Sequence, residues 1–148
     1  MHTISEELDR CFAAVEDGVW DWFPDLKYPR EVSAEYGAAN RYANPDEGFM
    51  VWMDEMGQEH GVNSYIRVIE RRESSDIIFH TLLSGVPKGR QRFWRHRWWE
   101  LTAGAAWDRP IDRPIEGLFK YFVFKKRCDI EYSLHGSLTE FRWPEHEG

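Results

Sequence analysis

The chain has 148 residues, which fits one globular domain, and such a length can bury a core without disulfides or metals. Its formal net charge of -7 at pH 7 argues against free nucleic acid as the default partner. The sequence has no run of about 18 apolar residues, so we expect no membrane-spanning helix and no membrane partner, and the absence of a basic targeting segment favours a cytoplasmic protein.

The charge is divided unevenly along the chain. Residues 1–60 hold 14 Asp and Glu against 4 Lys and Arg, a net of -10, and residues 61–148 hold 12 against 15, a net of +3. Within the second part, residues 86–127 have 11 basic and 4 acidic residues, a net of +7. The folded molecule therefore has either an acidic and a basic side or a surface on which the two charges are mixed.

Aromatic residues and cysteines set two further expectations. The eight Trp, nine Phe and six Tyr indicate a ring-rich core or, alternatively, a ring-rich binding face. Cys11 and Cys128 form neither a CxxC pair nor a metal-binding framework, so we expect reduced, buried thiols. We predict no metal site and no cofactor.

The first 47 residues are predicted to be an acidic and mainly helical part. A capping box at Thr3, followed by apolar residues at 3–4 spacing, predicts an amphipathic helix over about residues 4–17. Three large rings within residues 20–23 are expected to pack beneath a sheet rather than to form an exposed patch. A second, short helix is predicted over residues 31–42.

Residues 48–85 are predicted to form a three-stranded antiparallel meander. Alternating apolar residues separated by polar turns indicate strands at residues 49–54, 62–71 and 77–83. A hairpin loop is expected at residues 57–61. In the middle strand, Ile66 and Val68 fit a core position better than Ile69, because they lie on the less charged side.

Two later stretches are ambiguous between strand and helix. Residues 88–101 interleave five cations with four large rings, and the ring content favours a strand, although Trp94, Trp98 and Leu101 would line up on a helix. Residues 118–124 form a dense apolar run that also favours a strand, with a helix as the alternative.

A final hairpin is predicted at residues 130–143, followed by a loose tail at residues 144–148. Together these elements predict one globular domain, residues 1–148, in which residues 48–143 are mainly β. The expected fold is α+β, with the N-terminal amphipathic helix packed on a mainly antiparallel sheet of about five or six strands.

Catalytic motifs are absent from the sequence. It contains no phosphate-binding glycine loop, no GxSxG nucleophile elbow and no HExxH zinc motif. Glu59 and His60 are the best acid–base candidates, but they fall in a predicted turn, where such side chains usually face solvent. His80 is expected to be a core histidine that is hydrogen-bonded to a neighbour. These observations favour a protein that is not an enzyme.

The acidic N-terminal part favours a small, acidic, non-catalytic binding protein of the inhibitor or immunity type. Such a protein would occupy a basic surface of a protein target, for example one that binds nucleic acid, because carboxylates steer toward cationic clefts and compete there with phosphates. The expected partner-binding residues are Glu47, Asp54, Glu55 and Glu59.

Two alternatives remain. The basic–aromatic stretch could bind single-stranded nucleic acid, with cations on phosphates and rings stacked on bases. Its residues would be Lys88, Arg90, Arg92, Trp94, Arg95, Arg97, Trp98 and Trp99. The second alternative is a small enzyme with an aromatic pocket and one His–carboxylate pair.

Overall fold

A computed structural model of the chain describes residues 2–30, 42 and 44–146. The helices are α1 (His2–Asp17), α2 (Pro45–His60), α3 (Gln91–Thr102) and α4 (Glu116–Lys120), with short turns η2 (Lys88–Arg90), η3 (Tyr121–Lys125) and η4 (Pro144–His146). The strands are β1 (Pro24–Tyr28), β2 (Ser64–Arg71), β3 (Ile77–Leu83), β4 (Ala106–Asp108), β5 (Asp129–Leu134) and β6 (Ser137–Phe141). The second predicted helix, at residues 31–42, lies outside the described residues except for Tyr42, and so does the capping side chain of Thr3.

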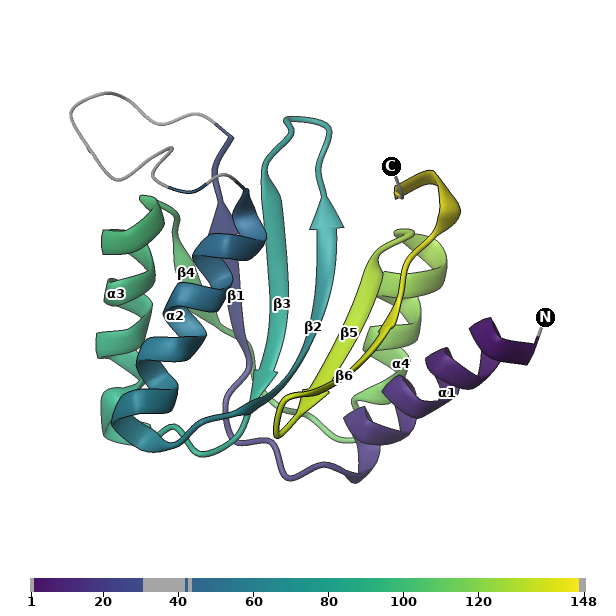
Figure 1. The fold of residues 1–148 in the computed structure, drawn as a ribbon, viewed down its shortest axis with the longest axis horizontal. Helices are drawn as coiled ribbons and strands as arrows, with labels where there is room; N and C mark the ends of the chain where they lie inside the picture. Colours follow the sequence, from purple (N-terminus) through teal and green to yellow (C-terminus); the bar gives the residue numbers. More distant parts are fainter. Residues whose placement is uncertain (1, 31–41, 43, 147–148) are drawn as a thin grey trace.

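Six strands of the described residues form one antiparallel sheet in the order β4-β1-β3-β2-β5-β6 (Figure 1). Tight connections join β2 to β3 and β5 to β6, and the two hairpins lie side by side because β2 also pairs with β5. The structure thereby confirms the predicted α+β class, and the strand number agrees with the expected five or six. Strands β1 and β4 were not predicted, because five and three residues are too few for a clear alternation.

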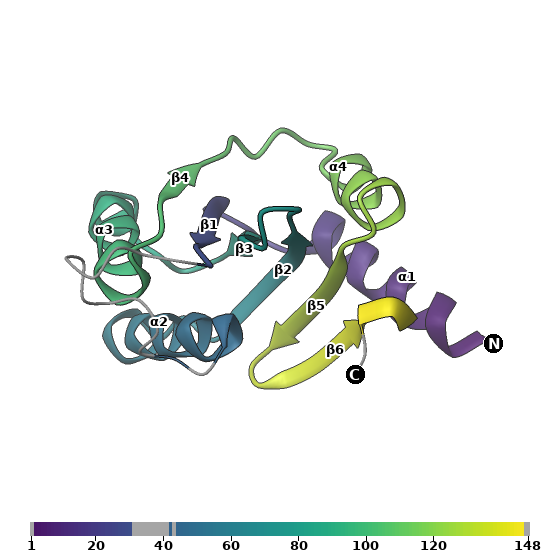
Figure 2. The same cartoon turned by 90° about the horizontal axis from the view of Figure 1, so that it is seen from above.

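Helices cover both faces of the sheet (Figure 2). One face packs against α2 and α3, and the other against α1, α4 and η3. Successive strand residues point to opposite faces, so on β2 Ile66 and Val68 join the α1 side, whereas Tyr65 and Ile69 join the α2 side. Ile66 and Val68 are core residues, as predicted, at 0% exposed, and Ile69 is buried as well, at 3%, because helices cover both faces of the sheet.

The strand predicted at residues 49–54 and the hairpin loop predicted at residues 57–61 are both wrong, because these residues belong to α2. The helix begins at Asn44, whose side chain accepts a hydrogen bond from the Glu47 backbone N–H at 2.9 Å, and it ends at Gly61, whose φ of 76° closes the last turn. The apolar residues that alternate along this stretch also fit helical spacing. Those buried on the core side are Gly48, Phe49, Trp52, Met53 and Met56.

The strands predicted at residues 88–101 and 118–124 are also wrong. Residues 91–102 form α3, which buries Trp94, Trp98 and Leu101 on one side, as in the helical alternative. The second stretch forms α4 and the π-helical turn η3. Helical spacing brings Trp94, Trp98 and Leu101 to one side, whereas on a strand Leu101 would point away from the face that carries Trp94 and Trp98. Residues 48–143 are therefore a mixture of helix and strand, not mainly β.

Several other predictions are confirmed. Helix α1 covers the expected residues, and Trp22 and Phe23 are buried against the sheet, at 3% and 1% exposed. Cys11 and Cys128 are free and buried, and burial raises the pKa of each thiol to about 12. Residues 144–146, which we expected to be loose, form the short turn η4.

Candidate partner-binding groove

Helix α2 has three chemically different sides. One side packs into the ring-rich core. The side toward α3 carries Glu55 and Glu59, whose carboxylates accept hydrogen bonds from Arg97 Nε at 2.7 Å and Arg90 Nη2 at 3.0 Å. The third side faces the β5–β6 hairpin and carries Asp54, which is exposed and has no hydrogen bond or ion pair among the described residues. The acidic residues of α2 are therefore divided between neutralised and open positions.

A hollow of about 460 Å³ lies between this third side of α2 and the hairpin, and we call it the α2–hairpin groove. Figure 2 shows α2 beside the hairpin, with neither α2 nor α3 covering β5 and β6. The groove is lined by Met50, Asp54 and Gln58 from α2, Tyr65 from β2, Ser133 from β5 and Gly136 from the hairpin turn. Met53 and Val62 also line the groove, so its surface is mainly apolar, and the Asp54 carboxylate lies at its edge.

Two large apolar side chains are exposed on this side of the sheet, Met50 in the groove lining and Leu138 outside it. Met50 is 42% exposed on α2, and Leu138 is 54% exposed on β6. Leu138 lies directly opposite Ser133 in the β5–β6 register, so it projects from the same face of the sheet as the groove lining. Strand β6 is also an edge of the sheet as described. Exposed methionine and leucine at an uncovered sheet face are typical of an interaction surface.

Beside the groove, a buried arginine lies between two carboxylates, and we call Asp46, Arg67 and Glu131 the Arg67 row. The Arg67 side chain is 3% exposed, and its Nε donates to Glu131 Oε1 at 2.6 Å while its Nη2 donates to Asp46 Oδ1 at 2.8 Å. Its guanidinium lies 4.2 Å from the ring centroid of Phe49 and 4.6 Å from that of Phe79. Stacked cations of this kind are stabilised by the ring faces.

The groove connects to the Arg67 row through Tyr65. The Tyr65 hydroxyl donates to Glu131 Oε1 at 2.7 Å, and burial together with the Glu131 carboxylate raises the pKa of Tyr65. The charge of Glu131 is therefore satisfied inside the protein by Tyr65 and Arg67. Asp54, in contrast, leaves its charge facing solvent at the groove edge.

The structure places the four predicted acidic residues, Glu47, Asp54, Glu55 and Glu59, on one helix rather than on a strand and a loop. The four carboxylates differ in which part of the protein they face. Glu55 and Glu59 face α3, whereas Asp54 lines the groove and Glu47 is exposed in the first turn of α2. Sequence reasoning missed Met50, Gln58 and Tyr65, because a strand assignment for residues 49–54 gives the wrong set of neighbours.

The basic–aromatic stretch is used largely inside the molecule. Trp94 and Trp98 are 3% and 0% exposed, and their ring N–H groups donate to His60 Nε2 and to the Lys27 carbonyl at 2.9 and 2.8 Å. Arg90 and Arg97 pair with α2, and Arg95 pairs with Asp108. The exposed members of the predicted set are Lys88, Arg92 and Trp99.

The predicted acid–base pair is not an open site. His60 Nε2 lies 3.3 Å from Glu59 Oε2 and also accepts the Trp94 ring N–H. A nitrogen that accepts this hydrogen bond cannot act as a free base. Neither Glu59 nor His60 lines the α2–hairpin groove.

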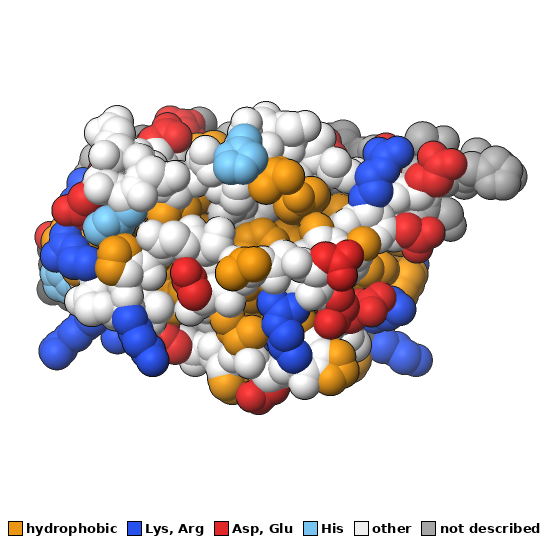
Figure 3. Space-filling model, turned by 90° about the horizontal axis from the view of Figure 1, so that it is seen from below, with side chains coloured by type: hydrophobic (Ala, Val, Ile, Leu, Met, Phe, Trp, Pro, Cys, Tyr) orange, Lys and Arg blue, Asp and Glu red, His pale blue; other side chains and the backbone are white. Residues whose placement is uncertain are grey.

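A second hollow, of about 500 Å³, lies next to the first at the end of the molecule shown in Figure 3. Val62 and Asn63 border both hollows. Val19, which is 86% exposed, stands at the second hollow with Leu134, and Figure 3 shows hydrophobic side chains gathered in the middle of this end with charged ones around them. The apolar area near the groove therefore extends beyond it.

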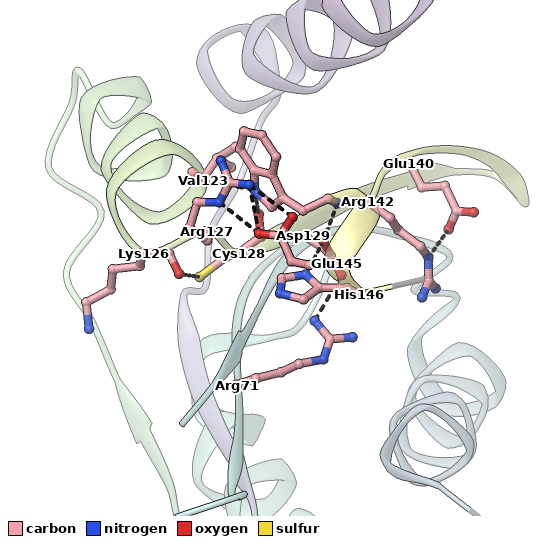
Figure 4. A network of polar contacts seen from close by, with 11 residues as sticks. Arg71, Val123, Lys126, Arg127, Cys128, Asp129, Glu140, Arg142, Glu145 and His146 are labelled. Atoms are coloured by element: carbon pink, nitrogen blue, oxygen red, sulfur yellow. Dashed lines mark hydrogen bonds and ion pairs between the residues drawn. The ribbon is translucent and has the colours of Figure 1, made fainter. Parts of the chain in front are cut away.

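The opposite end of β5 carries a network that holds the C-terminal segment (Figure 4). Asp129 is 1% exposed, and its carboxylate accepts hydrogen bonds from Arg71 and from the Trp143 backbone N–H while His146 Nδ1 lies 2.8 Å away. Arg127 stacks 3.6 Å from the ring centroid of Trp143. These contacts fix residues 143–146 on the domain, and we interpret the network as structural.

Among the described residues, no group of three or more His, Cys, Asp or Glu side chains has a geometry that could hold a metal ion. No helix in this part of the chain is long and apolar enough to cross a membrane. Comparison of the chain with protein-family models, with curated proteins and with solved structures finds no match.

Proposed function

We propose that the protein is a small non-catalytic binding protein, of the inhibitor or immunity type, whose α2–hairpin groove receives a basic surface of a protein target. The observation that carries the proposal is the groove itself, an apolar hollow of about 460 Å³ with the open carboxylate of Asp54 at its edge. A lysine or arginine side chain fits such a site, because its methylene stem can lie on apolar side chains while its charged head meets a carboxylate.

The charges around the groove support a basic partner. Asp46 and Glu140 have side chains that are 49% and 42% exposed, and Glu47 and Asp54 are exposed on the same helix. Asp46 and Glu140 are each paired with a cation, Arg67 at 2.8 Å and Arg142 at 3.6 Å, whereas the Asp54 carboxylate has no ion pair among the described residues. An excess of exposed carboxylates speeds encounter with a cationic surface and rejects an acidic one.

The apolar side chains would supply most of the affinity. Fully desolvated anchors near the centre of an interface usually contribute more to binding than charges at its rim. Met50 and Leu138 are 42% and 54% exposed, so a partner can cover them without moving the core. The charges at the edge would then set the orientation and the preference for a basic target.

The test is a charge reversal with a matched control, read out by capture from the native host or its natural target cell after nuclease treatment. Asp54→Lys should reduce recovery of a stoichiometric protein partner by about tenfold, which corresponds to about 1.4 kcal/mol. The control, Asp9→Lys, makes the same reversal at an exposed acid of α1 on the other side of the sheet.

A photo-crosslinking residue at Gln58, which lines the groove, should link to the same partner, and one placed at Asp9 should not. Equal loss of recovery in the two charge reversals, or crosslinking from Asp9 alone, would contradict the proposal. Recovery of nucleic acid in place of protein would favour the second candidate.

That second candidate, binding of single-stranded nucleic acid, is supported by the outer side of α3. Phe93 and Trp99 are 41% and 43% exposed there, near the exposed cations Lys88 and Arg92. Two exposed rings with cations nearby can stack on bases and contact phosphates. This reading predicts quenching of Trp fluorescence by single-stranded oligonucleotides at low salt, lost in Trp99→Ala; absence of quenching would remove it.

A further inference from the structure

A buried histidine lies between two carboxylates on the face of the sheet that packs against α1 and α4. His80 Nδ1 is 2.8 Å from Asp25 Oδ1, and His80 Nε2 is 2.7 Å from Glu70 Oε1. The three side chains, from neighbouring strands β1, β3 and β2, are 0%, 2% and 9% exposed for Asp25, His80 and Glu70. We call them the His80 row. The structure confirms that His80 is a core histidine bonded to its neighbours.

The two short contacts of the His80 row require one proton more than a neutral imidazole and two carboxylates provide. A neutral imidazole has one N–H group, and an ionised carboxylate can only accept hydrogen bonds. With a neutral ring, one of the two short contacts would bring two acceptors together in a buried site, which costs free energy. Either the ring carries protons on both nitrogens, or one of the two carboxyl groups is protonated.

The surroundings favour the carboxylate form of both acids. The second oxygen of Asp25 accepts a hydrogen bond from Arg109 Nε, and the second oxygen of Glu70 accepts one from Lys126 Nζ at 3.0 Å, with Arg72 Nε at 3.5 Å. Burial opposes ionisation of Glu70, but the hydrogen bonds and charges of His80 and Lys126 outweigh burial and lower its pKa. Each acid is therefore bonded to donors at both oxygens.

The ring of Phe122 covers His80. It stacks on the imidazole with 4.1 Å between centroids and an interplanar angle of 11°, and the Arg109 guanidinium lies 5.7 Å from the Phe122 centroid. An aromatic face stabilises a positive charge placed over it. The same cover leaves His80 with 1% of its surface exposed, so the proton it holds is shielded from solvent.

We propose that His80 is an imidazolium that donates from both ring nitrogens, so the row is a buried proton-binding site on which the stability of the fold depends. The site links β1, β3 and β2, and through Arg109 and Lys126 it also ties down the segments that flank α4. Loss of the proton leaves two buried acceptors in contact, and the unfolded form then becomes relatively more favourable. This inference does not depend on the proposed binding function.

The direct test is a long-range ¹H–¹⁵N correlation spectrum of the ¹⁵N-labelled full chain at pH 8, with the His80 signals assigned by their loss in His80→Gln. Both ring nitrogens of His80 should have the chemical shifts of protonated nitrogens, while a histidine in a short model peptide, which is neutral at this pH, serves as the control. One unprotonated nitrogen in His80 would overturn the proposal.

A second measurement uses Glu70→Gln, whose side-chain amide can donate to an unprotonated Nε2 and so removes the need for the additional proton. The folded wild type keeps a proton that unfolded histidine releases above about pH 6.5. Its equilibrium constant for unfolding should therefore rise by up to tenfold per pH unit in the alkaline range. That rise should be absent in Glu70→Gln, and equal slopes in the two proteins would overturn the proposal. If Glu70→Gln does not fold, the ¹H–¹⁵N spectrum of the wild type tests the proposal by itself.

Discussion

The Arg67 row and the His80 row lie on opposite faces of the sheet and share only strand β2, and each places one cation between two carboxylates. In the Arg67 row the cation is a guanidinium, which keeps its charge at every pH at which proteins are folded. In the His80 row the proposed cation is an imidazolium, which can lose a proton. The comparison suggests that one face of the sheet is held by a permanent charge and the other by a titratable one.

The largest effect is expected from removing the permanent charge. Arg67→Met keeps an unbranched apolar stem without the guanidinium and leaves Glu131 buried without its cation. Loss of one partner of a buried pair typically costs about 3–5 kcal/mol. Urea unfolding at pH 7 would measure this loss. The double variant Arg67→Met/Glu131→Gln should regain much of the lost stability. A loss below about 1 kcal/mol in Arg67→Met alone would show that solvent screens the Arg67 row more than its burial indicates.

A smaller loss is expected from His80→Leu. Asp25 and Glu70 lose their shared donor but keep Arg109 and Lys126, so the cost should be that of a buried hydrogen-bonding deficit, about 1–3 kcal/mol. The same urea experiment compares the two rows directly. If His80→Leu lowered the free energy of unfolding more than Arg67→Met does, the His80 row would contribute more to stability than the Arg67 row, contrary to this prediction.

Acid should weaken the His80 row through Glu70. Its lowered folded-state pKa means that this carboxylate stabilises the fold above its unfolded pKa of about 4.3, and that the contribution is lost as the pH falls through the folded value. Stability measured from pH 6 to pH 3 should therefore converge between wild type and Glu70→Gln. A constant difference over this range would mean that Glu70 is not the responsible group.

The smallest effect is expected at the surface pairs between α2 and α3. Arg97→Ala removes a bidentate pair with Glu55 in which both side chains are 31% exposed. Partly exposed pairs of this kind contribute about 0–1 kcal/mol. The salt dependence of the unfolding midpoint should also decrease in the variant. A loss of several kcal/mol would show that α3 depends on this pair for its position.

Local sequence patterns were sufficient for the elements whose signal is unambiguous. The 3–4 spacing of residues 4–17 identified α1, and alternation bounded by polar turns identified β2, β3 and the β5–β6 hairpin. These patterns depend on which side of one element is buried, which the chain itself encodes. The same reasoning found the buried thiols and the hydrogen-bonded His80.

Tertiary packing determined the rest. The apolar side chains of residues 49–54 and 91–102 fit the spacing of a helix as well as that of a strand. These residues form helices because the sheet has a second face that must be covered, and no local sequence pattern reveals that face. Packing also paired Glu55 and Glu59 with Arg97 and Arg90, while Asp54, on the same helix, was left at the groove edge. Composition alone counts charges, but only distances between elements far apart in the chain decide which charges neutralise each other and which remain available to a partner.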